Sequence, residues 1–234
     1  MNANEFARNL DVRGNSHGML AIIYSIDEDK QTDYLHWVTR EHTLERVSVP
    51  GFQRARLFRH IDPSRQEFLT LYSLDHAAVV ASPEYIERLN NPTPWSTRIM
   101  PLMQGMTRGG GSIVQAALDG EGAFVAVIRL DQSRVNALNG EAGAILAREI
   151  AGLDRIASVR ILAVDPEATG IPTNEKSIRG KDMSFDGLLI IEGLDASSVL
   201  EAAQRVKKPV EAETDPVDVY SSVFSRTKPK MIAN

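Results

Sequence analysis

Runs of apolar residues and stretches of helical periodicity follow each other in the same order in both halves of the chain. Apolar, β-branched-rich runs and period-two runs predict strands, and amphipathic stretches between them predict helices. In the first half, strands are predicted at 19–26, 52–61, 67–74 and within 99–117, with helices at about 32–47 and 75–89. In the second half, strands are predicted at 123–130, 157–164, 186–192 and 218–225, with helices at about 138–152 and 195–207. Each half therefore has the order β-α-β-β-α-β, the split βαβ or ferredoxin-like order.

The two halves also resemble each other residue by residue, which indicates a duplication. Residues 18–26 are similar to residues 122–130, and residues 71–75 are similar to residues 191–195. The second half contains additional polar residues at about 167–181, a composition typical of a surface loop. We therefore expect a lead-in of residues 1–17, a first ferredoxin-like module at 18–117 that holds the candidate site, and a degenerate second module at 118–234.

Composition narrows the class of protein without identifying its chemistry. Of 234 residues, 43% are hydrophobic and 24% charged, as in ordinary globular domains. The net charge of −5 and the lack of a basic stripe argue against nucleic acid or an anionic membrane as partner. Because there is no cysteine, disulfides, thiolate metal sites and a cysteine nucleophile are excluded. No secretory signal and no membrane-spanning apolar run is present, so we expect a cytoplasmic protein.

The first predicted helix and the strand after it carry most of the polar residues that could do chemistry. The helix contains the pattern Trp-x-x-x-Glu-His-x-x-x-Arg-Val at residues 37–47, followed by Pro-Gly-Phe and alternating arginines. This pattern resembles EthD-like proteins of the dimeric α/β-barrel superfamily. The resemblance implies an α+β fold in which two tandem ferredoxin-like modules pack as a dimeric α/β-barrel. It also implies a homodimer, although the fused tandem could already close one barrel alone.

A helical wheel ranks the candidates on this helix. At 100° per residue, one face holds Tyr34, Trp37, Val38, Glu41, Leu44 and Glu45, with His42 at its border. A carboxylate in an apolar stripe is either paired or has a raised pKa, which suits a general acid or base. We therefore predict Glu41 and His42 as catalytic residues. The alternative is that Glu41 forms a structural ion pair while His42 donates to a backbone carbonyl.

The second strand and its neighbours supply the other candidates. Period-two alternation places Phe52, Arg54, Arg56, Phe58 and His60 on one face. Arg54 and Arg56 are predicted to stabilise an oxyanion as catalytic residues. The predicted substrate-binding residues are Tyr24, Tyr34, Trp37, Phe58, His60 and Tyr72. The alternatives are a solvated strand edge for the arginines and satisfied core positions for the tyrosines.

The motifs that are missing limit the reaction type. No His-Glu-x-x-His spacing and no phosphate-binding glycine loop occurs, so we expect neither a metal nor a cofactor. These observations favour a cofactor-independent isomerase, cyclase or lyase that moves a proton on a small carbonyl-bearing cyclic or aromatic metabolite. The superfamily also includes haem proteins, so a haem-binding oxidoreductase using His42, His60 or His76 is an alternative. A non-catalytic ligand-binding or stress-response barrel is another.

Overall fold

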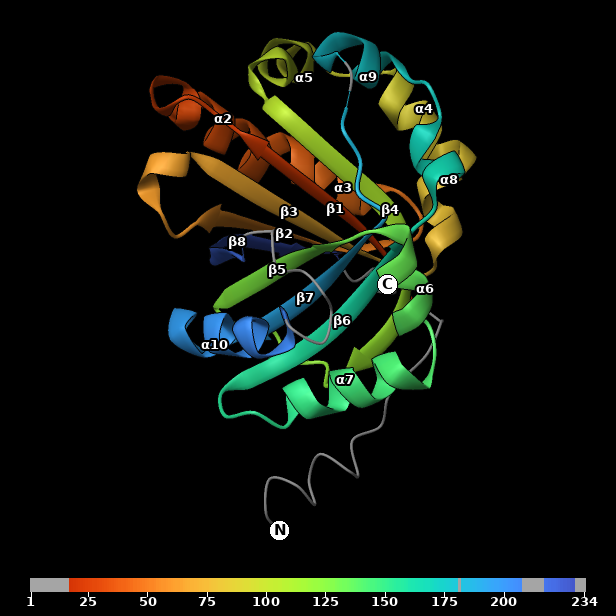
Figure 1. Ribbon diagram of the computed structural model, residues 1–234. Helices are drawn as coiled ribbons and strands as arrows, with labels where there is room; N and C mark the ends of the chain where they lie inside the picture. Colours follow the sequence, from red (N-terminus) through yellow and green to blue (C-terminus); the bar gives the residue numbers. More distant parts are fainter. Residues whose placement is uncertain (1–16, 181, 208–216, 230–234) are drawn as a thin grey trace, which may run out of the picture. The chain divides into compact units, whose positions relative to one another are not determined.

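The computed structural model describes residues 17–180, 182–207 and 217–229. All the predicted strands and helices are present, in the predicted order along the chain, together with further short helices (Figure 1). In the first half the elements are β1 (Gly18–Ser25), η1 (Glu28–Lys30), α2 (Gln31–Trp37), η2 (Val38–His42), α3 (Thr43–Ser48), β2 (Phe52–His60), η3 (Pro63–Arg65), β3 (Glu67–Leu74), η4 (Ala77–Ala81), α4 (Pro83–Asn90), α5 (Pro94–Ile99), η5 (Met100–Leu102) and β4 (Gln104–Ala117). In the second half they are β5 (Phe124–Leu130), α6 (Gln132–Leu138), α7 (Glu141–Ala151), β6 (Ile156–Val164), α8 (Pro166–Gly170), α9 (Asn174–Arg179), β7 (Gly187–Gly193), α10 (Ala196–Lys207) and β8 (Asp218–Thr227).

The strands are hydrogen-bonded in the order β1-β3-β2-β8-β5-β7-β6-β4 and close into a barrel. The chain divides into two compact units that are each assembled from separate segments. The described part of the N-terminal unit comprises residues 17–111, 165–184 without 181, and 223–229. The described part of the C-terminal unit comprises residues 112–164, 185–207 and 217–222. The α8–α9 segment therefore belongs to the N-terminal unit, although it lies between two strands of the other one.

In the C-terminal unit, an apolar layer fills the space between the sheet and its helices. Strand β7 pairs antiparallel with both β5 and β6. Ile128 and Ile191 pack in one cluster with Ala147, Ile150 and Val199 from α7 and α10. Small and branched side chains such as these fill a core closely.

In the N-terminal unit, β3 pairs antiparallel with β1 on one side and with β2 on the other. The register places Tyr24 opposite Phe68 and Leu20 opposite Tyr72, so all four side chains share one sheet face. This face packs against the helices, and the site described below lies in this layer.

The first helix departs from the helical wheel because it contains a π-turn. In η2 the backbone N–H of Thr43 bonds to the carbonyl of Val38, five residues back, so the turn holds one extra residue. The buried positions beyond it therefore move forward by one, to His42, Arg46 and Val47. The predicted burial of Leu44 is wrong, since this side chain is 43% exposed.

The second strand also departs from simple alternation. A register shift between Phe52 and Arg54 marks a β-bulge, which reverses the faces on its two sides. Phe52 consequently joins Ala55 in the apolar cluster under the helices. The expectation that Phe52 shares a face with Arg54, Arg56, Phe58 and His60 is wrong for this reason.

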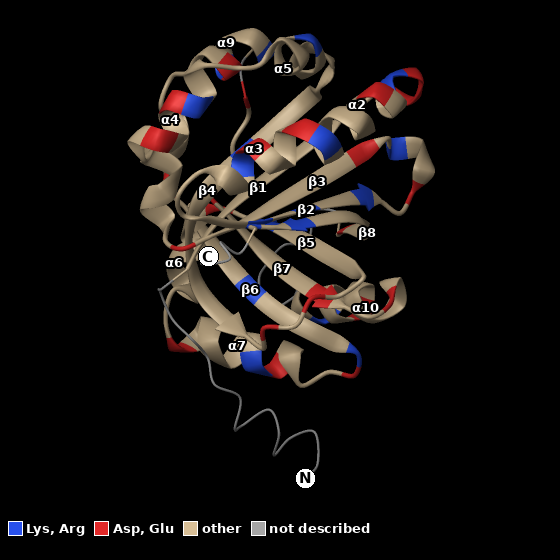
Figure 2. Cartoon of the chain, turned by 180° about the vertical axis from the view of Figure 1, so that it is seen from behind, with Lys and Arg blue, Asp and Glu red and all other residues tan. Residues whose placement is uncertain are grey.

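Two segments contain short helices that the sequence did not predict. Residues 94–102 form α5 and η5, because the hydroxyl of Thr93 accepts from the N–H of Ser96 and Pro94 starts the helix. Residues 166–179 hold α8 and α9, which begin after the capping residues Asp165 and Thr173. Figure 2 shows that α4 carries both acidic and basic residues.

Candidate functional site

A small cavity lies between the sheet and the helices of the N-terminal unit. Its volume is about 30 Å³, enough for a water molecule but far below the several hundred Å³ typical of an organic ligand. Its lining comes from β1, the first helix, β3, α4, η5, β4 and α9. The lining residues are Ile22, Trp37, His42, Arg46, Tyr72, Tyr85, Leu89, Met100, Met103, Met106, Arg108, Glu175 and Arg179.

His42 is the titratable base of this cavity. Its ring stacks on Trp37 with 4.2 Å between centroids, and the Trp37 indole N–H donates to Ser96 Oγ at 3.1 Å. Burial lowers the pKa of His42 well below its ordinary value, and the charges of Arg46 and Arg179 add to this effect. Its Nδ1 atom is buried and has no hydrogen-bond partner among the described residues. The site therefore holds a neutral imidazole with one unused nitrogen.

A buried ion-pair network lies next to His42. Arg46 Nη2 pairs with Glu175 Oε1, and the other carboxylate oxygen lies 3.4 Å from Arg179 Nη1. Arg179 also pairs with Asp182 at 2.9 Å. Arg46 Nη1 is buried without a hydrogen-bond partner in the described part of the chain. A guanidinium donor and an imidazole nitrogen left unused in one cavity are costly unless a water molecule or a ligand bonds to them.

Arg108 adds a further buried positive charge. It is 4% exposed and donates to the hydroxyl of Tyr85 at 3.2 Å, and no described carboxylate forms an ion pair with it. Arg46, Arg108 and Arg179 thus face two acidic groups, Glu175 and Asp182. Two further charged groups interact with this cluster: Lys176 with Arg108, Arg179 and Asp182, and Glu45 with Arg46 and Glu175.

Three of the predicted site residues meet in this cavity, namely Trp37, His42 and Tyr72. Burial raises the pKa of Tyr72 well above its ordinary value despite the opposing effect of Arg46, so its hydroxyl stays protonated. Tyr24 and Tyr34 lie elsewhere in the same layer. Their hydroxyl oxygens are 2.5 Å apart, and Tyr24 also contacts Thr70 Oγ1 at 3.0 Å.

The remaining predicted residues lie outside the cavity lining. Glu41 is half-buried and its carboxylate accepts from Thr93 Oγ1 at 2.6 Å. Arg54 is half-buried on β2, and the buried guanidinium of Arg56 lies over the Phe58 ring at 4.6 Å. The structure does not bring these residues together with His42.

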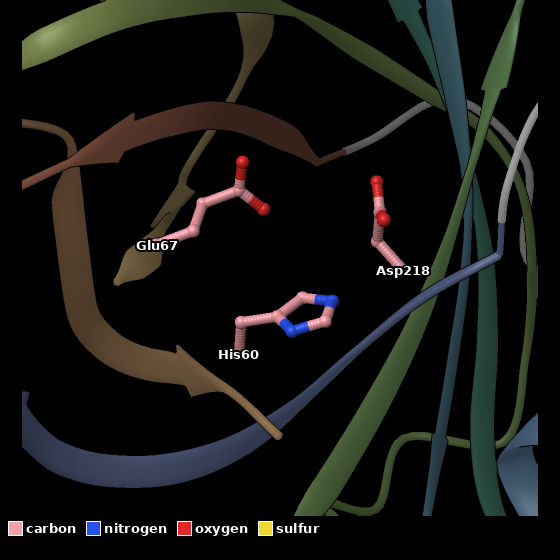
Figure 3. A group of neighbouring side chains, drawn as sticks. All are labelled: His60, Glu67 and Asp218. Carbon is pink, nitrogen blue, oxygen red and sulfur yellow. The ribbon is translucent and has the colours of Figure 1, made fainter. Parts of the chain in front are cut away.

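His60 lies at the end of β2, on the sheet face opposite the helices. Its imidazole and the carboxylate of Glu67 point into the same space (Figure 3). Arg65 contacts both, with 3.2 Å from its Nη1 to His60 Nε2 and 3.1 Å from its Nη2 to Glu67 Oε1. His60 is therefore engaged in a separate polar group.

Sequence reasoning missed Arg46, Arg108, Glu175 and Arg179. Arg46 could have been predicted from the sequence, because it follows His42 by four residues and belongs to the Trp-x-x-x-Glu-His-x-x-x-Arg-Val pattern. The other three come from β4 and α9, and a single sequence carries no signal that pairs such distant positions.

Comparisons with known proteins show the fold of this chain. No protein-family model matches it, and neither does any curated protein. A solved structure of an anthrone oxidase-like protein is 11% identical, with a TM-score of 0.58 over 95% of this chain and 99% of that one. A putative monooxygenase from Fusobacterium nucleatum is 9% identical, with a TM-score of 0.56 over 92% and 95% of the two chains. These likenesses and the eight-stranded antiparallel barrel confirm the predicted α+β, ferredoxin-like dimeric α/β-barrel fold.

A chlorite dismutase from Candidatus Nitrospira defluvii is also similar, with 9% identity and a TM-score of 0.49 over 94% and 95% of the two chains. All these identities are low, so they concern the fold alone. The EthD-like resemblance and the duplication stay predictions. Among the described residues, no helix is both long enough and apolar enough to cross a membrane.

Proposed function

We propose that the protein is a cofactor-independent enzyme that moves a proton on a small carbonyl-bearing cyclic or aromatic molecule bound in this cavity. The observation that carries the proposal is that two residues lining one cavity, His42 and Arg46, each have a buried polar atom without a hydrogen-bond partner among the described residues. His42 Nδ1 accepts a proton, and Arg46 Nη1 is a donor for an oxygen.

His42 is the better of the two predicted bases. It lines the cavity and is neutral, so it has a lone pair for a proton from the carbon next to a carbonyl group. Its lowered pKa makes it a weak base in the empty site. An anion in the cavity would offset the charges of Arg46 and Arg179 and so raise the basicity of His42.

The enolate oxygen formed by this deprotonation needs a hydrogen-bond donor. Arg46 and Arg108 line the same cavity, and each is almost fully buried. Guanidinium donors in a dry site stabilise a developing negative charge more strongly than they would in water. In this proposal they take the role that the sequence assigned to Arg54 and Arg56.

Hydrogen–deuterium exchange at carbon tests the proposal before the natural substrate is known. A panel of cyclic and aromatic keto acids is incubated in D2O, and loss of the signal of the proton next to the carbonyl is followed by NMR. Because two similar folds are described as oxidase-like or monooxygenase, oxygen uptake is recorded in the same samples.

The variants decide which base acts. We expect His42→Gln to abolish the accelerated exchange and Glu41→Gln to keep it. Equal exchange in the wild type and in His42→Gln would overturn the role of His42. Loss in Glu41→Gln alone would assign the base to Glu41 instead.

A further inference from the structure

The charges and the apolar wall of the cavity together define a class of ligand. We propose that the cavity binds an anionic acid with an apolar body, and that Arg46 and Arg108 hold its acid group. This inference rests on the proposed function for the location of the site, but its test measures binding and not proton transfer.

The first argument is the unbalanced charge. Arg46 offers Nη1, while its Nη2 already pairs with Glu175. Arg108 is buried against a neutral phenol. Because a buried guanidinium without a counter-charge is costly, the negative charge of an acid group would stabilise these two arginines.

The second argument is the apolar part of the lining. Met100, Met103 and Met106 line the cavity together with Trp37. Methionine side chains are unbranched and flexible, so they can yield to a ring that the cavity of about 30 Å³ does not accommodate as it stands.

Calorimetric titration with two matched compounds tests the inference. The probes are naphthalene-2-carboxylate and the neutral naphthalene-2-carboxamide. We expect the carboxylate to bind roughly tenfold or more tightly than the carboxamide, since hydrogen bonds to a charged group are strong. The chain has two tryptophans, so the indole N–H NMR signal that remains in Trp95→Phe reports whether the ligand reaches Trp37.

A variant tests the contribution of Arg108. Arg108→Met is expected to bring the ratio of the carboxylate and carboxamide affinities close to one. Arg88→Met, an exposed arginine on α4 that pairs with Glu45, is the matched control and should leave the ratio unchanged.

Equal affinity for the acid and the amide, or no binding of either, would overturn the inference. An unchanged ratio in Arg108→Met would do the same. If the acid binds as expected but no proton exchange depends on His42, the proposed function fails and this inference stands. If exchange depends on His42 but the acid shows no advantage, the ligand class is wrong and the proposed function stands.

Discussion

His42 shows how burial and neighbouring charges set the state of one residue. Two arginines and an apolar environment oppose its protonation, so the folded protein keeps the imidazole neutral. The same environment would cost stability if the ring had to become charged.

The pH dependence of stability should therefore contain a contribution from His42. Its folded pKa is lowered, so the unfolded chain binds a proton that the native chain does not once the pH falls below about 6.5. The free energy of unfolding should then drop by up to about 1.4 kcal/mol per pH unit. Urea denaturation from pH 7 to 5 should show this drop in the wild type and a shallower one in His42→Gln. Parallel curves for the two proteins would contradict the assignment.

Arg46 and Glu175 form the buried ion pair at the centre of the network. Breaking it with Arg46→Met alone should cost about 3–5 kcal/mol, because a carboxylate is left buried beside a reduced positive charge. Adding Glu175→Leu should recover much of this loss, since neither charge is then left unpaired. A double-mutant cycle by urea denaturation measures the coupling, and strictly additive costs would show that the pair is not coupled.

At the scale of elements, the π-turn η2 decides which residues of the first helix reach the cavity. It moves His42 and Arg46 onto the buried face and leaves Glu41 half-buried. Arg226, at the end of β8, donates to the carbonyl of Thr39 at 2.6 Å and to Thr43 Oγ1 at 3.1 Å. These bonds satisfy groups at the wide turn and so favour it.

Replacing Arg226 should weaken this turn. Arg226→Met removes both hydrogen bonds and is expected to destabilise the protein by about 1–3 kcal/mol. Amide hydrogen exchange at Thr43 should become faster, because its bond to Val38 lies within the turn. Arg129→Met, at an exposed position on β5, is the control. Unchanged exchange at Thr43 would show that Arg226 does not stabilise the turn.

The sequence predicted the order of strands and helices along the chain. Two local irregularities limited the prediction of which side chains form the site. The helical wheel assumes 3.6 residues per turn, and a single π-turn breaks that assumption after Val38. The bulge after Phe52 breaks period-two alternation in the same way. Neither has a compositional signature. Trp37 could be predicted because it precedes the irregular turn, and His42 because the helical wheel placed it at the border of the apolar face.

At the scale of the whole molecule, the extra segment of the second half explains why sequence reasoning could not assemble the site. It was predicted as a surface loop, yet α9 carries Glu175 and Arg179 into the N-terminal unit. In the C-terminal unit, side chains of the apolar cluster occupy the layer between sheet and helices.

Native mass spectrometry tests two expectations for the whole molecule, that it is a homodimer and that it carries no cofactor. We expect twice the mass of the chain, for a homodimer, with either no ligand or a small organic acid. A bound mass matching haem would contradict the cofactor-independent proposal and favour the haem-binding alternative. Mutants of His42, His60 and His76 would then be tested by the Soret band after haem addition.

The measurement that tests the central claim most directly is an NMR titration of the His42 ring, without and with saturating naphthalene-2-carboxylate. The account predicts a pKa well below 6.5 in the free protein and a clear rise when the acid is bound, since its negative charge offsets those of Arg46 and Arg179. An ordinary pKa in the free protein, or the same value with and without the acid, would contradict the claim that His42 and the arginines form one anion-binding, proton-accepting site.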